Sequence, residues 1–230
     1  MRKTACLWLS GLFIFAVSCC AAASSAGAAP AGAGGFSALT GDDLERVKAG
    51  EIVMKIGEDD RCYTARTFAM VDGDIETVWD VILDFDRFQD FMPNTIKSRA
   101  EWVDEGTAYY HGVIKVLLFK QNYVLKHTLE NGKDRKTDRW EQADREKLFD
   151  DRSSVNLTVS EGRWTLERVG GRTFSDYFAC VNISDRIPEF VRKRAINILI
   201  NYSVPEIIKA ARKRTEEIIS GGSKKTKDSS

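Results

Sequence analysis

The chain has 230 residues and a formal net charge of zero, because 34 Lys and Arg residues balance 34 Asp and Glu residues. Hydrophobic residues make up 43% and aromatic residues 10% of the chain, which is enough apolar surface for a folded core. This balance excludes a nucleic-acid binder that relies on a strongly basic domain, and a single long apolar stretch excludes a multi-pass membrane protein.

The first residues have the layout of a secretory signal. Arg2 and Lys3 precede an apolar core at residues 7–17, and a run of small residues follows. We therefore predict a signal peptide at residues 1–29, a flexible linker at residues 30–40, and export to the periplasm or to the outside of the cell. An uncleaved anchor helix is the alternative, although the apolar core is short for a bilayer.

The cysteines bear on export in two ways. Cys19 ends a short stretch that resembles a bacterial lipobox, and its lipidation would tether the protein to a membrane. Cleavage of the signal leaves Cys62 and Cys180, which either form one disulfide in an exported protein or remain as two buried thiols. They show no CxxC spacing and no His cluster, so we predict no metal site and no cofactor.

The expected domain covers residues 41–220 and begins with a short helix at residues 42–48. Two strands are predicted at residues 51–56 and 61–71, separated by a turn-prone stretch. The sequence thus opens the domain with one helix and two strands.

An amphipathic helix follows this first pair of strands. Asp74 is a favourable N-cap, and Ile75, Val78, Trp79 and Ile82 recur at helical spacing, so one face of the helix is expected to be buried. Trp79 is interpreted as a core residue.

A second short helix is predicted just before Pro93. Phe88, Phe91 and Met92 share one face of it, and they are interpreted either as core or as the rim of a cavity.

From residue 96 onward the pattern becomes that of strands. Strands are predicted at residues 107–118, 122–129, 138–144, 154–159, 162–169 and 172–183. Gly170 and Gly171 mark a tight hairpin between the last two. Sequential strands of this kind favour an antiparallel meander.

Two histidines lie in this region, His111 and His127. If the first hairpin turns near residue 120, they lie close to opposite each other on adjacent strands. They share odd parity with Tyr109, Tyr123 and Leu125, so we expect all five side chains to face the same side of the sheet. The histidines are interpreted as polar anchors for a ligand, as general acids or bases, or as structural imidazoles.

Large aromatic residues recur on the later strands. Trp140, Trp164 and Tyr177 are expected on the inner face of the sheet, where they either line a pocket or fill it.

The last part of the domain is predicted to be helical. One helix covers residues 190–200 and a second opens near Pro205, with Ile208 on its apolar stripe. Tyr202 lies at the break between them, which is interpreted as a gate or as an ordinary loop. Residues 221–230 form a polar tail that is expected to be disordered.

Basic residues are concentrated in this C-terminal region. They predict either a solvated helix face or peripheral contact with an anionic membrane.

Three segments of the chain resemble the START-like, helix-grip superfamily, which includes Bet v 1-like allergens, polyketide cyclases and coenzyme-Q-binding proteins. Residues 74–93 (DIETVWDVILDFDRFQDFMP) resemble its opening in the bacterial cyclase-like branch. Residues 162–166 (GRWTL), followed by Gly171, Arg172, Thr173 and Tyr177, resemble its last two strands, and residues 187–192 (IPEFVR) resemble the entry to its C-terminal helix.

The resemblance implies an α+β helix-grip fold. In that fold a curved antiparallel sheet wraps around a long C-terminal helix, with two short helices after the first strand. It also implies a hydrophobic tunnel between sheet and helix, filled by a lipid, an isoprenoid or a polycyclic molecule.

Three functions are compatible with these features. The first is an exported monomer that binds or carries a hydrophobic small molecule, and the absence of familiar catalytic motifs favours it. The second is a cyclase or dehydratase that uses a His or Tyr for proton transfer. The third is an interaction module without a ligand. The candidate cavity residues are Phe88, Phe91, Met92, Tyr109, His111, Tyr123, Leu125, His127, Trp140, Trp164, Tyr177, Tyr202 and Ile208.

Overall fold

A computed structural model describes residues 35–36, 39, 41–58, 60–116, 119–152, 157–183, 189–198, 201 and 204–227. The predictions for the signal segment, for Cys19 and for Tyr202 lie outside the described residues. The described residues all belong to one unit, Gly32–Ser230.

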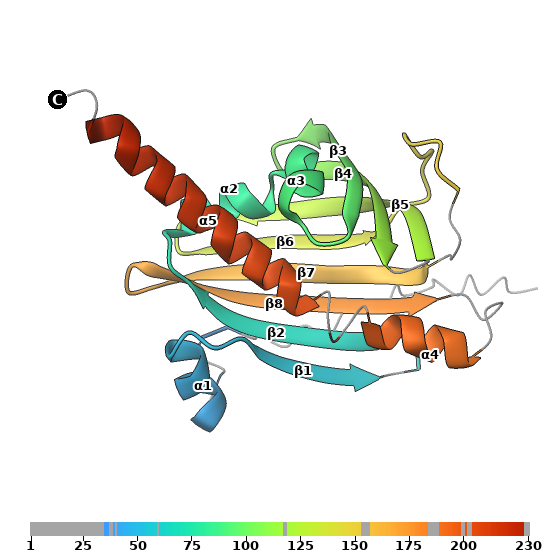
Figure 1. Ribbon diagram of the computed structural model, residues 1–230, viewed down its shortest axis with the longest axis horizontal. Helices are drawn as coiled ribbons and strands as arrows, with labels where there is room; N and C mark the ends of the chain where they lie inside the picture. Colours follow the sequence, from blue (N-terminus) through green and yellow to red (C-terminus); the bar gives the residue numbers. More distant parts are fainter. Residues whose placement is uncertain are drawn as a thin grey trace, which may run out of the picture. The chain divides into compact units, whose positions relative to one another are not determined.

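An antiparallel sheet forms the framework of this unit (Figure 1). Its strands pair in the order β1-β2-β8-β7-β6-β5-β4-β3, so β3 to β8 form a meander and the β1–β2 hairpin joins the free edge of β8. The strands are β1 (Val53–Glu58), β2 (Tyr63–Val71), β3 (Thr95–Asp104), β4 (Thr107–Val116), β5 (Phe119–Asn131), β6 (Arg135–Gln142), β7 (Leu157–Val169) and β8 (Arg172–Ile183).

The hairpin between β7 and β8 forms where the two glycines predicted it. Gly170 and Gly171 have φ values of 54° and 82°, and Val169 pairs with Arg172 across them. A two-residue turn with positive φ at both positions matches the twist of the flanking strands, and glycine adopts it without strain.

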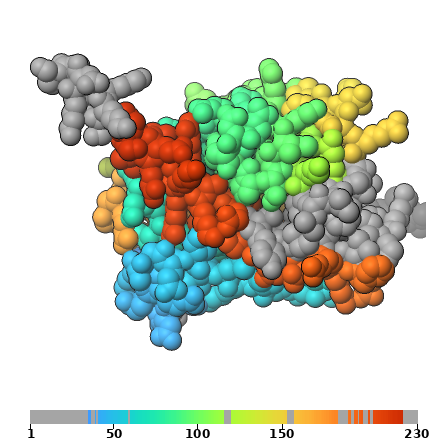
Figure 2. Space-filling model, viewed as in Figure 1, coloured from blue at the N-terminus to red at the C-terminus, as the bar shows by residue number. Residues whose placement is uncertain are grey.

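Six helical segments accompany the sheet in the described part of the chain. They are α1 (Gly41–Lys48), α2 (Ile75–Ile82), the 3₁₀ turn η2 (Phe85–Arg87), α3 (Phe88–Phe91), α4 (Glu189–Ile198) and α5 (Val204–Lys227). Helix α5 crosses the face of the sheet that also carries α2 and α3 (Figure 1). The space-filling view shows α5 and the α3 region side by side at the surface (Figure 2).

Helix α2 begins as the sequence predicted. The Asp74 side chain accepts hydrogen bonds from the backbone amides of Glu76 and Thr77, both at 3.0 Å. The apolar residues of the helix, Ile75, Val78, Trp79, Val81 and Ile82, are all buried. The cap thus fixes the helix start, and the apolar stripe fixes the face that packs on the core.

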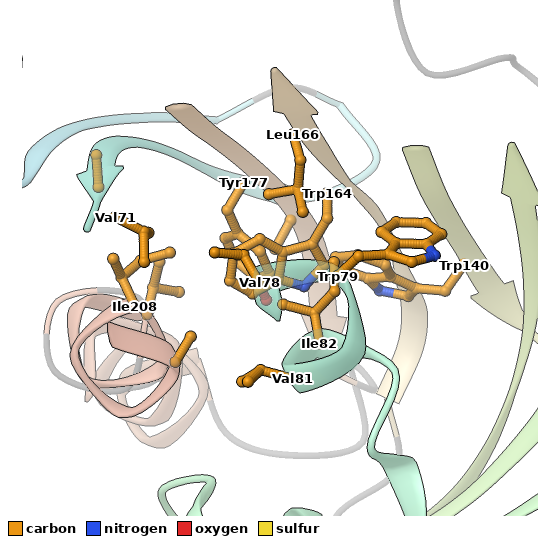
Figure 3. Packing of buried hydrophobic residues seen from close by; sticks show 14 of the residues in the cluster. Val71, Val78, Trp79, Val81, Ile82, Trp140, Trp164, Leu166, Tyr177 and Ile208 are labelled. Atoms are coloured by element: carbon orange, nitrogen blue, oxygen red, sulfur yellow. The ribbon is translucent and has the colours of Figure 1, made fainter. Parts of the chain in front are cut away.

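Two apolar clusters lie on opposite faces of the sheet. The main cluster fills the space between the sheet, α2 and α5, where Trp79 and Ile208 meet the inner side chains of β7 and β8 (Figure 3). The smaller cluster covers the outer face of β1, β2 and β8 beneath α1, with Val47, Phe68 and Phe174 at its centre.

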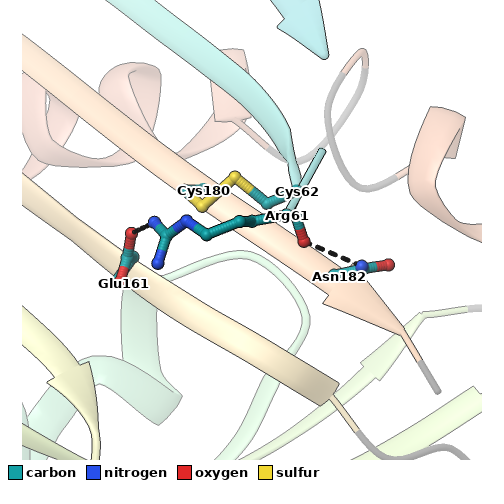
Figure 4. Close-up of a disulfide and its surroundings, with 5 residues drawn as sticks. All are labelled: Arg61, Cys62, Glu161, Cys180 and Asn182. Atoms are coloured by element: carbon teal, nitrogen blue, oxygen red, sulfur yellow. Dashed lines mark hydrogen bonds and ion pairs between the residues drawn. A yellow bond between two sulfur atoms is a disulfide. The ribbon is translucent and has the colours of Figure 1, made fainter. Parts of the chain in front are cut away.

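A disulfide joins Cys62, just before β2, to Cys180 on β8, with a Cα–Cα distance of 5.6 Å (Figure 4). Beside it the Arg61 side chain pairs with Glu161, and Asn182 Nδ2 donates to the Arg61 carbonyl at 2.8 Å. These contacts connect the start of β2 to β7 and β8. Of the two states left open for these cysteines, the structure has the bonded one.

Two elements differ in extent from the prediction. The stretches expected as separate strands at residues 154–159 and 162–169 belong to one strand, β7, which has a register irregularity between Leu157 and Val159. Helix α5 runs to Lys227, past Gly221, where a disordered tail was expected to begin. Gly221 keeps a negative φ, and a glycine in helical conformation costs only about 1 kcal/mol relative to alanine, so it does not by itself end a helix.

Candidate ligand-binding cavity

A cavity of about 200 Å³ lies between the inner face of the sheet, the beginning of α5 and the segment that links α3 to β3. Most of its wall is aliphatic or aromatic. The lining residues are Ala65, Ile82, Phe85, Phe88, Met92, Pro93, Asn94, Thr95, Tyr110, Ile114, Tyr123, Leu125, His127, Asp138, Trp140, Leu157, Ser160, Trp164, Tyr177, Ala179, Val181, Val204 and Ile207.

Small residues on neighbouring strands create the space for this cavity. One row of paired residues crosses the sheet from β2 to β4: Ala65, Ala179, Gly162, Trp140, His127 and Ala108. A Cβ atom on Gly162 would lie 2.3 Å from Trp140 Cζ2 and 2.3 Å from the Phe178 carbonyl oxygen. The indole of Trp140 therefore occupies the place that any larger residue at position 162 would need.

Aromatic rings form the floor of the cavity. The Tyr177 ring lies 5.5 Å from that of Trp140 and 4.8 Å from that of Trp164, centroid to centroid. All three residues belong to adjacent strands, and their side chains gather on the inner face (Figure 3). They line the cavity and do not fill it.

The main polar feature of the wall is a buried pair, His127 on β5 and Asp138 on β6. His127 Nδ1 lies 2.8 Å and 3.0 Å from the two carboxylate oxygens of Asp138. Because an ionised carboxylate only accepts hydrogen bonds, Nδ1 carries the proton, and Nε2 of the neutral ring is left as an acceptor. The Nε2 atom is buried and has no hydrogen-bond partner within the described residues.

Two tyrosines lie close to this pair. The Tyr110 ring centroid is 6.0 Å from that of His127 and 5.9 Å from that of Tyr123. Burial raises the pKa of Tyr123 to about 12 and raises the pKa of Tyr110 well above its ordinary value. Both phenols thus keep their protons at neutral pH and present O–H groups in an apolar environment.

The rim of the cavity combines two segments that are far apart in sequence. Phe88, Met92 and the residues Pro93 to Thr95 form one side, and Val204 and Ile207 of α5 form the other. Asn94 has a φ of 65°, a conformation that Asn tolerates better than most residues, and it turns the chain from α3 into β3. The rim therefore lies at the start of the C-terminal helix.

The expectation that both histidines face the cavity is wrong for His111. Val116 pairs with Phe119, so the hairpin turns at residues 117–118, and odd-numbered residues of β4 pair with even-numbered residues of β5. His111 consequently pairs with Val124, while His127 pairs with Ala108. A turn centred about two residues earlier than expected thus places His111 and Tyr109 on the opposite face of the sheet from His127.

His111 has its own environment on that outer face. Its Nε2 lies 3.4 Å from Glu101 Oε2, and the backbone amide of Leu148 donates to Nδ1 at 3.4 Å. Burial lowers the pKa of His111, and the neighbouring Glu101 opposes this shift. Tyr109 lies nearby, beneath the guanidinium of Arg145, which is 4.2 Å from its ring centroid.

The other candidate residues divide clearly. Phe88, Met92, Tyr123, Leu125, His127, Trp140, Trp164 and Tyr177 line the cavity. Phe91 packs against Phe88 with a centroid distance of 5.6 Å and does not line it, and Ile208 is fully buried in the main cluster.

The sequence analysis did not identify two polar residues of the site, Asp138 and Tyr110. Asp138 shares its strand face with Trp140, and this alternation was the available signal for an inward-facing carboxylate. Tyr110 was placed on the wrong face by the same error in register that misplaced His111.

Two further searches of the described residues gave nothing. No group of three or more His, Cys, Asp or Glu side chains gathers as a metal ion would require. In the same residues no helix is both long enough and apolar enough to cross a membrane.

Comparison with known proteins places this cavity in context. Residues 71–201 match the family described as polyketide cyclase/dehydrase and lipid transport. No curated protein matches the sequence.

Among solved structures, the fold is similar to that of a STAR-related lipid transfer protein from Xanthomonas axonopodis, with a TM-score of 0.61, 18% identity, and coverage of 72% of this chain and 93% of the other. It is similar to human STARD10 at a TM-score of 0.59 and 13% identity, covering 81% of this chain and 84% of that protein. It is also similar to the Zhui aromatase/cyclase from Streptomyces sp. R1128, at 0.55 and 13%, covering 68% and 94%. At these identities the likeness establishes the START-like, helix-grip fold.

Proposed function

The chain belongs to the polyketide cyclase/dehydrase and lipid transport family, and we propose that it binds and carries a hydrophobic small molecule in the cavity beneath α5. A lipid, an isoprenoid or a polycyclic compound has the required chemistry. The observation that carries this proposal is the cavity itself, whose wall is mainly aromatic and aliphatic side chains. Burial of apolar ligand surface there contributes about 25 cal/mol per Å² to binding.

The titles of two structural neighbours support the same function, since both the Xanthomonas protein and STARD10 carry the name of lipid-transfer proteins of the STAR type. Their low identity makes this support general, because proteins of one fold carry different ligands. The ligand of this chain must therefore be found by experiment.

A pair of variants tests the proposal directly. Ala179 lies on the cavity wall, so Ala179→Phe places a ring inside the cavity, whereas Ala49→Phe adds the same atoms at an exposed turn. We expect the parent protein and Ala49→Phe to take up dansyl-undecanoic acid or pyrene with increased fluorescence, and Ala179→Phe to lose at least tenfold in affinity. Equal uptake by all three proteins, each shown to be folded by its melting curve, would place the binding site elsewhere.

We also propose that the protein is exported and acts in the cell envelope. The signal-like residues 1–29 support this location, and so does the disulfide between Cys62 and Cys180, a bond that persists in oxidising compartments. Cell fractionation followed by intact-mass measurement tests it. A chain cut within the small-residue run would indicate free export, a lipidated chain beginning at Cys19 would indicate a tether, and a full-length cytosolic chain would refute export.

Contact with a membrane through the C-terminal helix is a further part of this proposal. Ile218 and Ile219 are exposed near Lys213 on α5. Ion pairs within the helix, such as Lys209 with Glu206 at 2.6 Å, reduce its net charge, so the apolar pair is expected to dominate any contact. Co-sedimentation with anionic vesicles should fall in the variant Ile218→Ser/Ile219→Ser. We propose that the protein is a monomer in solution, which light scattering can check.

A second candidate function is a cyclase or dehydratase, and one observation favours it. The His127–Asp138 pair faces the cavity with a free ring nitrogen, which is the arrangement of a general base held by a carboxylate. The variant His127→Gln separates the two functions. Turnover of a bound ligand that disappears in this variant while binding persists would establish an enzyme, and binding without turnover in the parent protein would leave a carrier.

A further inference from the structure

The cavity wall contains two buried polar atoms that face the same region without partners. They are His127 Nε2 and Tyr110 Oη, neither of which makes a hydrogen bond within the described residues. Tyr123 and Thr95 lie near enough to Tyr110 to affect its pKa, but not in hydrogen-bond geometry. Leaving such atoms unpaired in an apolar site is unfavourable, and buried polar groups in proteins are usually paired.

The sheet register brings these two atoms to one place. Tyr110 pairs with Leu125 and Ala108 pairs with His127, so Tyr110 and His127 are diagonal neighbours on the inner face. Their ring centroids are 6.0 Å apart and their planes are nearly perpendicular, at 86°. The His127 ring is also held by Phe85 at 4.5 Å and by the Asp138 carboxylate, which fixes its orientation.

The two atoms have complementary hydrogen-bonding properties. Asp138 holds the proton on Nδ1, so Nε2 can only accept a hydrogen bond, whereas the Tyr110 phenol can donate one. We propose, on the basis of the carrier function above, that the apolar ligand bears a hydroxyl group, which donates to His127 Nε2 and accepts from Tyr110 Oη.

Other polar groups satisfy this pair less well. A ketone, an ether or a carboxylate offers only acceptors and leaves Nε2 unpaired. An ammonium group donates but brings a charge into an apolar cavity, where its desolvation is costly. A single alcohol or phenol satisfies both atoms at once, so the site selects hydroxylated apolar molecules over their deoxy and ether analogues.

Three probes of nearly equal size test this selectivity: 2-naphthol, 2-methoxynaphthalene and 2-methylnaphthalene, with affinities measured by calorimetry on the full mature chain. We expect 2-naphthol to bind about 10- to 100-fold more tightly than 2-methylnaphthalene, because only the former pairs the buried acceptor. The methoxy compound should bind no better than the methyl compound, since it has no donor.

Three variants assign the effect to particular atoms. His127→Leu and Tyr110→Phe should each reduce the preference for 2-naphthol to a few-fold or less, with the affinity for 2-methylnaphthalene retained. Tyr109→Phe is the matched control, because Tyr109 lies on the opposite face of the sheet, and its preference should equal that of the parent protein.

The possible results separate the two proposals. Equal binding of 2-naphthol and 2-methylnaphthalene to the parent protein would overturn the hydroxyl site and leave the apolar carrier intact. Failure of all three probes, together with failure of the fluorescent lipids, would overturn the carrier function and the hydroxyl site with it. A preference that survives in both folded variants, His127→Leu and Tyr110→Phe, would overturn the assignment of these residues.

Discussion

At the scale of single residues, Gly162 determines how much room the cavity wall leaves. A Cβ atom there would lie 2.3 Å from both the Trp140 ring and the Phe178 carbonyl oxygen, and a backbone atom cannot easily move away. We expect Gly162→Ala to lower the free energy of unfolding by about 1–3 kcal/mol through overpacking.

Urea denaturation measures this effect. Gly221→Ala is the control, because a Cβ atom there meets nothing within 4 Å and the residue is in a helix. This variant should be neutral or slightly more stable. A Gly162→Ala protein as stable as its parent would mean that Trp140 moves freely and does not define the cavity wall.

The buried tyrosines predict how stability depends on pH. In the unfolded chain Tyr123 has the ordinary pKa of 10.0, and burial in the folded protein raises its pKa to about 12. Burial also raises the pKa of Tyr177. Between pH 10 and 12 the unfolded state loses these protons first, so the free energy of unfolding should fall by up to about 1.4 kcal/mol per pH unit for each tyrosine.

Below pH 10 these phenols should cause no pH dependence, because both states keep their protons. Urea denaturation at a series of alkaline pH values checks the slope, and Tyr123→Phe should reduce it. A stability that stays flat to pH 12 would show that the phenols are accessible to water.

Residue-level prediction from the sequence was right where one pattern sufficed and wrong where register was needed. The inward positions of Trp140, Trp164 and Tyr177 were confirmed, because alternation within each strand indicated them. His111 was misplaced because its face depends on the turn at residues 117–118, and a shift of one residue in pairing moves a whole strand's side chains to the other face.

At the scale of elements, Asp74 controls the start of α2. Its carboxylate accepts two backbone hydrogen bonds and one from the Thr77 hydroxyl, and the bonds to Thr77 in particular hold the pKa of Asp74 below its usual value. Asp74→Ala should cost about 1 kcal/mol of stability, measured by thermal or urea denaturation. Asp74→Ser, which retains a capping oxygen, should recover most of it; equal losses in the two variants would contradict the capping role.

The disulfide is the main covalent constraint between elements. It links residues 118 positions apart, across β2 and β8, and closure of so long a loop restricts the unfolded chain strongly. The double variant Cys62→Ala/Cys180→Ala should therefore be less stable by about 4 kcal/mol. A reducing agent should lower the melting temperature of the parent protein and leave that of the double variant unchanged. If the reducing agent has no effect on the parent, the two thiols are not joined.

Element boundaries were predicted less well than element types. The sequence placed a break near residue 160 because Ser160 to Gly162 are poor strand formers, yet β7 runs through them, since paired neighbours β6 and β8 support it on both sides. The start of α2, by contrast, followed from a local signal, the Asp74 cap, which needs no tertiary context.

At the scale of the whole molecule, the order of elements was enough to predict the architecture. Two strands, short helices, a run of strands and a final helix gave the helix-grip fold, because consecutive antiparallel strands pair with their neighbours and an apolar helix must cover the sheet. The cavity was expected from the resemblance, but its polar part was not. The His127–Asp138 pair depends on contact between strands, which no local pattern in the sequence reveals.

The account as a whole rests on a ligand held between the sheet and α5. Native mass spectrometry of the protein purified from its own cells, followed by solvent extraction, measures this directly. We predict one apolar molecule bearing a hydroxyl group per chain in the parent protein, and loss of that molecule in Ala179→Phe. A parent protein that carries no small molecule and takes none up from a mixture of lipids would contradict the account and favour a module that binds other proteins.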